Sequence, residues 1–375
     1  MTYLITIILC ISGLVWKKSK ILFMLLLVWM WILFGWNTDN VDYANYVYLY
    51  NTEPSLTEFN YEFGYRLICA AGNMLGLEYQ QFLIPISAIG LILIASTIKK
   101  YSENPCYVLS LYLITTFFVN VIQIRSFLAS AIIIFAIRYL VERSKVNNII
   151  YVTFTLIAST IHFSALFYLA FVFITIIKKK LLIGMALFVS VCSYFIWDSG
   201  VVQQLMINLT NIEKVANWSL GQNVNSYLFN GAIQVATLIL VSRYAQVFEK
   251  ERVLKTEGNH NQLIVRESLH NYINAISLIN WIMLTCTVLY LIDGTFSRIF
   301  TGVVPLNLIF FSNTFPEFKL CHSKSAIKRE IRDTQNKILS RYLIHIIYAV
   351  IIFSYTVLAY ADLTIIPILE NNSLF

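Results

Sequence analysis

Runs of apolar residues, each close to the length needed to cross a membrane, recur from the first residues of the chain to about residue 361. An α-helical span needs about 20 such residues, and short polar or charged stretches separate one run from the next. The pattern predicts an all-α, polytopic integral membrane helix bundle with about 12 transmembrane helices. The expected spans cover residues 2–16, 21–36, 81–98, 106–122, 126–141, 149–161, 163–177, 181–197, 226–241, 271–292, 299–315 and 342–361.

The lysines set the expected direction of each span. Lys17, Lys18 and Lys20 directly follow the first run, and cationic loops are retained on the cytoplasmic side of a membrane. The N-terminus is therefore expected outside, and an even number of crossings places the C-terminus outside as well. The first run lacks a small-residue cleavage site, so we interpret it as a retained span rather than a signal peptide.

The segment 62–77, EFGYRLICAAGNMLGL, interrupts this alternation. It is apolar but short, and a full crossing here would place Lys99 and Lys100 on the outer side. We therefore expect a re-entrant or interfacial helix. A membrane tolerates such a helix where protein or a watery cavity covers its backbone.

Composition supports the membrane class. Of the 375 residues, 58% are hydrophobic and 13% are charged, whereas soluble domains are about half apolar and a quarter charged. The spans leave no room for a soluble domain, so residues 1–375 are expected to form a single polytopic membrane domain. Its main outer loops are expected at 37–61 and 198–225, and its main cytoplasmic loops at 243–270 and 316–341.

Charge, cysteines and motifs exclude several other classes. The net charge of +7 is explained by cytoplasmic loops that face anionic lipid, so no nucleic-acid partner is expected. The six cysteines show no C-x-x-C spacing and lie mostly in apolar segments, which favours neither a disulfide framework nor a zinc site. The chain has no Walker loop and no H-E-x-x-H motif, which argues against ATP hydrolysis and zinc proteolysis.

A few cations break the charge asymmetry. All but four of the 27 Lys and Arg residues are assigned to the cytoplasmic side, and the exceptions are Arg66, Arg125, Lys214 and Arg298. The three arginines lie at the edges of apolar segments. A guanidinium binds phosphate through two parallel hydrogen bonds, so two or three converging arginines could hold a diphosphate. The alternatives are snorkelling to outer headgroups for Arg125 and pairing with Asp293 for Arg298.

The outer stretch after the second run carries acids and regularly spaced tyrosines. Asp39 and Asp42 precede Tyr43, Tyr46 and Tyr50, and on a helix the tyrosine spacings of three and four would put the tyrosines on one face. Such a face suits stacking against sugar rings, although an interfacial aromatic belt has the same pattern. The two acids are either functional groups or solvated loop residues.

Two further outer positions combine charge with an apolar setting. Glu62, Tyr65 and Arg66 share one helix face, either as an internal ion pair or as functional groups at the hydrocarbon boundary. His162 joins two apolar runs in STIHFSA and is the only histidine expected outside. It is either a hydrogen-bonded structural group or a general base or phosphate ligand.

Several of these stretches together resemble a known family. They are GWNTDNVDYANYVYLY, YEFGYRL, QIRSFLASAI, IASTIHFSAL and the later FSR, within about residues 35–300. The set is similar to the G-x-D…Y…Y, E-x-G-Y, R-x-x-x-A, H-x-S-A and terminal-Arg pattern of the EpsG/Wzy-type bacterial polysaccharide polymerases. The chain departs from relatives at Ser126, where many carry Gln. Neither Arg125 nor Arg298 begins the R-x10-G pattern of some O-antigen polymerases.

The resemblance implies a metal-independent glycosyltransferase without a cofactor, at the outer face of the bacterial inner membrane. The donor would be a glycan on polyprenyl diphosphate and the acceptor a lipid-linked repeat unit. Because the lipid diphosphate already activates the donor, no nucleotide is needed. The implied partners are the polyprenyl-diphosphate-linked oligosaccharide, membrane lipids, and flippase and chain-length regulator proteins.

The resemblance also assigns roles to the outer residues. Arginines would neutralise the departing diphosphate, an acid or the histidine would deprotonate the acceptor hydroxyl, and tyrosines would contact the sugars. The expected catalytic residues are Arg125, His162, Arg298, Asp39 and Glu62. The expected substrate-binding residues are Arg66, Asp42, Tyr43, Tyr46, Tyr50 and Tyr65.

Two other functions fit part of the pattern. A flippase or exporter of lipid-linked glycans would need charges along a route across the bilayer, but the mid-span positions are nearly free of charge. A membrane acyltransferase that modifies a polysaccharide would need a histidine and an arginine along a tunnel from the cytoplasm. The candidate residues instead gather on the outer side.

Overall fold

The computed structural model describes residues 1–52, 62–198, 224–253, 260–313, 346–348, 350–352 and 361–375. Within these ranges the chain is helical and has no β-strand, and an isolated antiparallel bridge joins Asn37 to Asn372. The expected all-α class is therefore confirmed. Lys214 and the expected loop 316–341 lie outside the described residues, as do most of the loop 198–225, most of the span 342–361 and parts of the loops 37–61 and 243–270.

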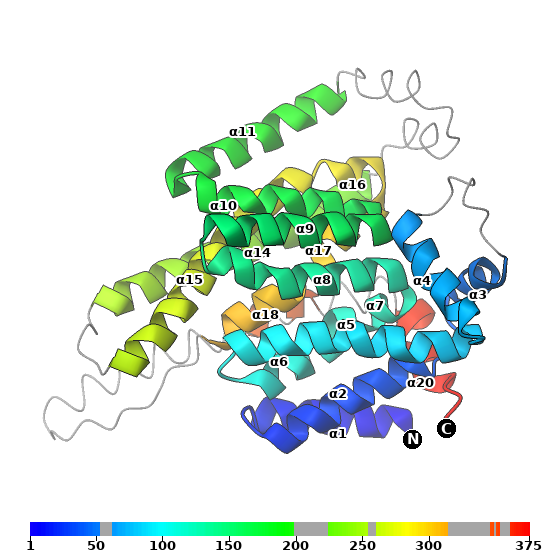
Figure 1. The fold of residues 1–375 in the computed structure, drawn as a ribbon. Coiled ribbons are helices and arrows are strands. Elements are labelled where there is room, and N and C mark those ends of the chain that lie inside the picture. The colour runs from blue at the N-terminus through cyan, green and yellow to red at the C-terminus, as the bar shows by residue number, and fades with distance from the viewer. Residues whose placement is uncertain (53–61, 199–223, 254–259, 314–345, 349, 353–360) are drawn as a thin grey trace, which may run out of the picture.

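The first half of the chain forms a stack of long helices (Figure 1). They are α1 (Thr2–Val15), α2 (Lys20–Gly35), α5 (Tyr79–Tyr101), the run of α6 (Pro105–Tyr112), η1 (Leu113–Phe117) and α7 (Phe118–Ile122), α8 (Ile124–Val141) and α9 (Lys145–Ile161). Local sequence explains several boundaries. The Ser19 hydroxyl accepts a hydrogen bond from the Leu22 amide at the start of α2. Pro105 occupies the first turn of α6, where a missing N–H costs little.

The second half of the chain is a less regular series of helices. It contains η2 (Phe163–Val172), α10 (Phe173–Ile176), α11 (Lys179–Asp198), α14 (Val224–Val253), α15 (His260–Met283), η3 (Leu284–Cys286), α16 (Leu289–Ile292), η4 (Gly294–Phe296), α17 (Ser297–Thr301), α18 (Val304–Ser312), η5 (Ala361–Ile365) and α20 (Ile366–Glu370). Figure 1 places α11 at the edge of the bundle, and most of its apolar side chains are exposed. Such exposure is expected of a helix that faces lipid.

Seven helical segments in the described part of the chain are long and apolar enough to cross a membrane. They are Tyr79–Tyr101, Pro105–Ile122, Ile124–Val141, Lys179–Trp197, Val224–Gln246, Glu267–Ile292 and Gly294–Ser312, and the shorter apolar helices are Thr2–Val15, Lys20–Gly35 and Phe163–Ile176. The protein is therefore a multi-pass membrane protein. The expected number of about 12 crossings stays a prediction.

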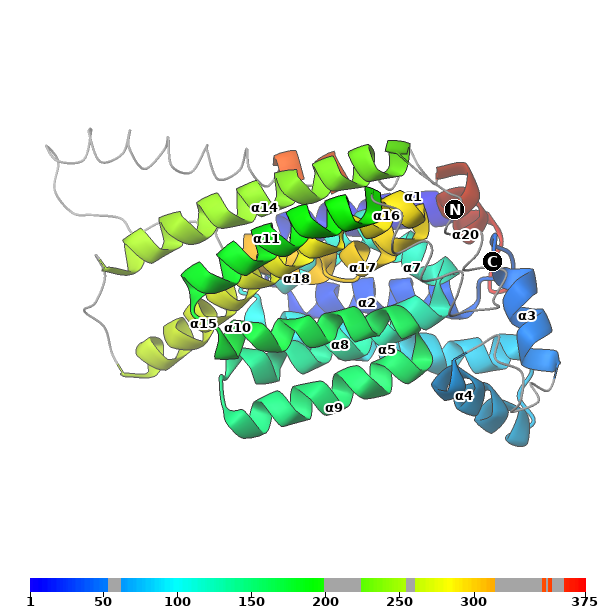
Figure 2. The same cartoon turned by 90° about the horizontal axis from the view of Figure 1, so that it is seen from above.

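Two short helices, α3 (Tyr43–Asn51) and α4 (Phe63–Met74), lie at one end of the bundle (Figures 1 and 2). The 12 residues of α4 extend only about 18 Å, less than the ~30 Å hydrocarbon core, so α4 is too short to cross. Its first turn contacts the last turn of α9, and a Cβ at Gly64 would lie 2.8 Å from the Thr160 carbonyl carbon. This arrangement agrees with the re-entrant or interfacial helix expected for 62–77.

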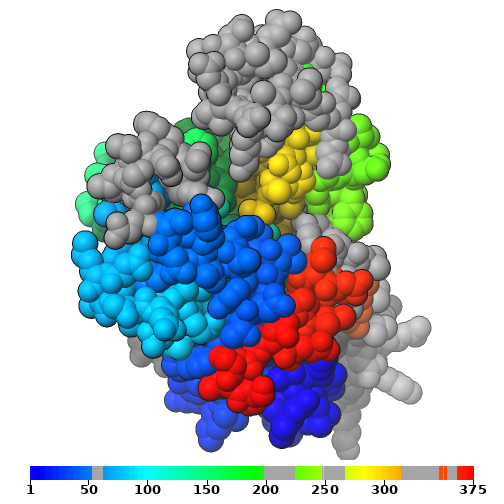
Figure 3. All heavy atoms as spheres, turned by 90° about the vertical axis from the view of Figure 1, so that its right-hand side faces the viewer, coloured from blue at the N-terminus to red at the C-terminus, as the bar shows by residue number. Residues whose placement is uncertain are grey.

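Both chain termini lie at the end of the bundle that carries α3 (Figures 1 and 3), and we call this end the site end. There the Thr2 hydroxyl donates to the Leu369 carbonyl over 2.6 Å. The opposite end, where Lys100 pairs with Glu142 at 2.8 Å, is called the lysine-rich end. It carries Lys17, Lys20, Lys99, Lys100 and Lys145. The described helices therefore separate most lysines from the predicted functional residues.

Candidate active site

Three side chains that the sequence predicted as catalytic meet at the site end, and we call Glu62, Arg125 and His162 the charged cluster. Glu62 caps the start of α4, and its Oε2 lies 2.6 Å from Arg125 Nη1 in α8. Its Oε1 lies 2.9 Å from Nδ1 of His162, which stands between α9 and η2. Oε1 also accepts the Phe163 backbone N–H over 3.1 Å. The carboxylate thus joins three separate segments.

The backbone at His162 supplies part of this site. His162 is extended (φ −149°, ψ 119°), so the hydrogen-bond ladder of α9 stops there and η2 begins at Phe163. The Phe163 N–H has no acceptor within its own helix, and the positive end of the helix dipole favours a carboxylate beside it. Sequence reasoning missed this amide, although the junction of two apolar runs at His162 was its signal.

Arg125 occupies a position that requires an anion. Gln123 (φ −100°, ψ 61°) interrupts α7 and α8 and places Arg125 in the first turn of α8. The positive end of a helix dipole disfavours a cation there. The negative charge of Glu62 offsets this cost. The side chains of Arg125 and Glu62 are 21% and 19% exposed, so the pair is accessible from the surface of the protein.

Two tyrosines enclose Arg125. Its guanidinium carbon lies 5.9 Å from the Tyr46 ring centre and 6.0 Å from the Tyr65 ring centre. Tyr46 also lies within electrostatic reach of both Arg125 and Arg298. Burial raises the pKa of Tyr46 by more than the charge of Arg125 lowers it, so the hydroxyl stays neutral and can donate. Tyr46 is therefore a neutral polar group near both arginines.

Glu62 is held in its ionised form. Burial acts to raise its pKa, but hydrogen bonds and the nearby positive charges, led by the hydrogen bond from His162 and the charge of Arg125, lower the pKa from 4.5 to about 2. Both carboxylate oxygens already accept hydrogen bonds. Glu62 is therefore suited to orient Arg125 and His162, and it is a poor acceptor for a substrate proton.

Three predicted residues lie around the charged cluster. Arg298 is partly buried in α17, and Asp42, which precedes α3, acts electrostatically on Tyr46. Arg66 is partly buried in α4, one turn after Glu62. The structure thus brings two further cations and one acid to the same end as the charged cluster.

Three other predicted residues make different contacts. Asp39 accepts a hydrogen bond from Asn371 Nδ2 over 3.2 Å, which joins it to the C-terminal residues. The Tyr43 hydroxyl donates to Gln80 Oε1 over 2.9 Å. Tyr50 is 1% exposed and donates to a backbone carbonyl between α4 and α5 over 2.8 Å. Tyr43 and Tyr50 therefore pack α3 against its neighbours and do not form an open stacking face with Tyr46.

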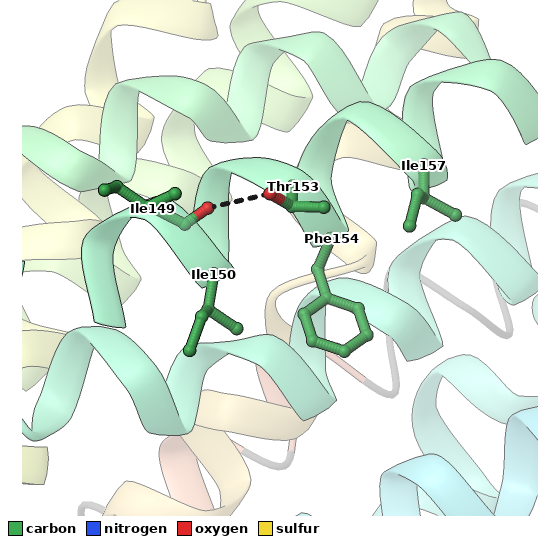
Figure 4. Close-up of a pocket in the computed structure, with 5 residues that line it drawn as sticks. All are labelled: Ile149, Ile150, Thr153, Phe154 and Ile157. Carbon is green, nitrogen blue, oxygen red and sulfur yellow. Dashed lines mark hydrogen bonds between the residues drawn. The ribbon is translucent and has the colours of Figure 1, made fainter. Parts of the chain in front are cut away.

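A small hollow lies along α9, and none of its lining residues belongs to the charged cluster (Figure 4). It measures about 150 Å³ and is lined by Ile149, Ile150, Thr153, Phe154 and Ile157. The Thr153 hydroxyl donates within its own helix to the Ile149 carbonyl over 3.0 Å. The hollow is therefore apolar and suits contact with lipid. Among the residues that the structure describes, no group of three or more His, Cys, Asp or Glu could hold a metal ion.

The fold and the charged cluster define a multi-pass helical membrane protein with an ion-pair site at one end of its bundle. The model of the EpsG family matches residues 20–368, and the chain belongs to the EpsG family. Membership confirms the resemblance and makes this a polymerase-type membrane protein of polysaccharide biosynthesis. Searches of curated proteins and of solved structures returned no match.

Proposed function

We propose that the protein lengthens a polysaccharide at the outer face of the bacterial inner membrane. It transfers a glycan from polyprenyl diphosphate onto a lipid-linked repeat unit, without a metal or a cofactor. The observation that carries the proposal is the charged cluster, with Tyr46 beside it and Arg298 within electrostatic reach of Tyr46, at the end opposite the lysine-rich end. Because lysines mark the cytoplasmic side, this opposite end is assigned to the outside.

His162 is assigned as the general base. Its Nδ1 lies 2.9 Å from an ionised carboxylate, so this nitrogen carries the proton and donates it to Glu62. Nε2 then has a free lone pair that can accept the proton of the acceptor hydroxyl. The new glycosidic C–O bond forms as the bond between the anomeric carbon and the diphosphate oxygen breaks. Glu62 positions the ring and stabilises the imidazolium that forms.

Arg125 and Arg298 are assigned to the departing diphosphate. Arg125 binds Glu62 through Nη1, and its planar guanidinium is the kind of group that binds phosphate oxygens. Tyr46, which contacts Arg125 and is within electrostatic reach of Arg298, adds a neutral donor. Such preorganised donors stabilise the charge that develops on the leaving group. Arg66 and Asp42 are assigned to substrate binding around them.

The direct test uses purified protein in lipid vesicles with a synthetic polyprenyl-diphosphate-linked repeat unit, and no nucleotide or added metal. Wild-type protein should produce chains of several units. Arg125→Ala, Arg298→Ala and His162→Ala should each lower the extension rate about 100-fold or more. Arg125→Lys should lose most activity too, because an ammonium lacks the planar fork.

The matched control is Arg138→Ala. Arg138 is a partly buried arginine in the last turn of α8, and it donates to Ser96 over 2.9 Å. This variant should keep wild-type extension. Normal chain lengths in all three site variants would contradict the proposal. Movement of unextended lipid-linked units across the vesicle membrane, with no chain growth, would favour a flippase instead.

A further inference from the structure

One buried tyrosine joins the elements that carry the candidate catalytic residues. Tyr168 in η2 is 2% exposed, and its hydroxyl donates to the Ile299 carbonyl of α17 over 2.9 Å. The Ser130 side chain of α8 lies beside the same phenol group. Tyr151 of α9 donates to the Tyr168 backbone carbonyl over 2.9 Å. Four elements, α8, α9, η2 and α17, therefore meet at this one residue.

Each element that the tyrosine hydroxyl or its own helix contacts carries or adjoins a candidate catalytic residue. Ile299 directly follows Arg298, and Ser130 shares α8 with Arg125. The tyrosine itself belongs to η2, which begins directly after His162. The tyrosine hydroxyl therefore connects the backbone supports of the proposed base and of both proposed diphosphate ligands.

The 3₁₀ geometry of η2 sets the register between His162 and Tyr168. A 3₁₀ helix has about three residues per turn, so side chains three positions apart lie on one face. The buried positions Ala165, Tyr168 and Phe171 follow this spacing. Tyr168 therefore lies two turns along the face that begins at His162, about 12 Å along the axis. Long 3₁₀ runs are uncommon and need support from tertiary contacts, which the hydrogen bonds of Tyr168 supply.

A glycine leaves room for these contacts. A Cβ at Gly302 would overlap the Tyr168 hydroxyl and lie 2.6 Å from Ser130 Oγ. Gly302 also donates its N–H to the Arg298 carbonyl over 3.0 Å. Two successive carbonyls are thus held, that of Arg298 by Gly302 and that of Ile299 by the tyrosine. These two hydrogen bonds fix the backbone that carries the Arg298 side chain.

We propose that Tyr168 is a positioning residue that holds His162 and Arg298 at the separation needed for glycan transfer. The inference rests on the proposed function. A base and a leaving-group cation must act on one reacting centre, and here they come from the residue before η2 and from α17, which are far apart in sequence. A displacement of about 1 Å can lower a rate about 100-fold. A hydrogen bond between the two elements limits such displacement.

The test compares two tyrosine hydroxyls in equivalent settings. Tyr168→Phe removes only the hydroxyl that bonds α17. Tyr272→Phe is the matched control, because Tyr272 is also buried and donates to the Leu306 carbonyl over 2.9 Å. Tyr272 stacks on Tyr101, near the lysine-rich end. Both variants should insert and melt alike, since each loses one buried hydrogen bond.

The expected result is a split between rate and binding. In the vesicle assay, Tyr168→Phe should lower kcat about tenfold while KM changes by less than about twofold, because substrate binds but the reacting groups are misaligned. Tyr272→Phe should keep the wild-type kcat. Gly302→Ala should lower kcat in the same way as Tyr168→Phe, whereas Gly231→Ala, which has open space around it, should not.

A kcat of Tyr168→Phe equal to that of Tyr272→Phe would overturn the inference, as would a loss confined to KM. The two possible failures are distinguishable. If wild-type protein neither extends chains nor binds polyprenyl diphosphate, the proposed function fails and this inference fails with it. If wild-type protein extends chains and Tyr168→Phe matches its control, only this inference fails.

Discussion

Among single residues, Glu62 has the most influence on the site. Its carboxylate binds the Arg125 guanidinium, the His162 ring and a backbone amide within 3.1 Å. Removing one partner of such a partly buried group leaves the others with unsatisfied charge or hydrogen bonds. Substitution of Glu62 should therefore disturb both Arg125 and His162. Its effect on activity should not be additive with the effects of substituting Arg125 or His162.

The ionisation of Glu62 makes stability depend on pH. The pKa of Glu62 is lowered from 4.5 to about 2 in the folded protein, so ionised Glu62 stabilises the fold above pH 4.5. This contribution is lost as the pH falls from 4.5 towards 2. We expect the melting temperature of wild-type protein in detergent to fall more steeply over this window than that of Glu62→Gln.

Glu142→Gln is the control for this comparison. Glu142 pairs with Lys100 at the lysine-rich end, and its side chain is 50% exposed. An exposed pair contributes little, so this variant should follow the wild-type melting curve throughout. Parallel curves for wild type and Glu62→Gln would contradict the assigned role of Glu62.

At the scale of elements, the contact between α4 and α9 holds the charged cluster together. Glu62 caps the start of α4 and His162 follows the end of α9, so these two helix ends must meet. The meeting is close, because a Cβ at Gly64 would lie 2.8 Å from backbone of Thr160. A glycine is therefore required where α4 reaches α9.

Gly64→Ala should damage both stability and activity. The added methyl should force α4 away from α9, which should cost about 1–3 kcal/mol in the free energy of unfolding and lengthen the Glu62–His162 contact. Denaturation in detergent and the vesicle extension assay measure the two effects. Gly184→Ala in α11, which has open space around it, should keep wild-type activity and stability. Normal extension by Gly64→Ala would show that this close contact is dispensable.

The whole molecule has two chemically different ends. The lysine-rich end carries the cations expected to face the cytoplasm, and the site end carries both termini, the charged cluster and α3 (Figures 1 and 3). If the substrate lies outside the cell, it can reach the site only when the site end faces outward. The assigned orientation is therefore as important to the proposal as the site itself.

Labelling in intact cells tests the orientation. In a background with Cys192 and Cys321 replaced by Ser, a membrane-impermeant maleimide should label Asp39→Cys without permeabilisation. It should label Lys145→Cys only after permeabilisation, because the positive-inside rule places this residue in the cytoplasm. Labelling of Lys145→Cys in intact cells would reverse the topology and contradict an outer-face reaction.

The sequence predicted the elements of this fold better than their contacts. Hydropathy indicated the all-helical membrane class, and the short run at 62–77 indicated a helix that does not cross. The residues 37–61 were expected to form an outer loop, and the structure has the helix α3 within them, which the tyrosine spacing fits. The spacing did not indicate whether the tyrosine face points to solvent or into the protein. An interfacial aromatic belt, a sugar-binding face and a packed helix face all have the same spacing of three and four residues. The structure turns Tyr46 toward Arg125 and buries Tyr50 in the protein.

The sequence by itself determined that this chain is a membrane helix bundle whose cations lie mostly on one side, since hydropathy and charge act locally along the chain. It also singled out Glu62, Arg125 and His162, because each is polar at the edge of an apolar run. Only the tertiary structure decided that they meet. The sequence offered Arg66, four positions away, as the partner of Glu62, whereas the structure pairs Glu62 with residues 63 and 100 positions away. Such pairs depend on how helices pack, and local periodicity carries no information about that packing.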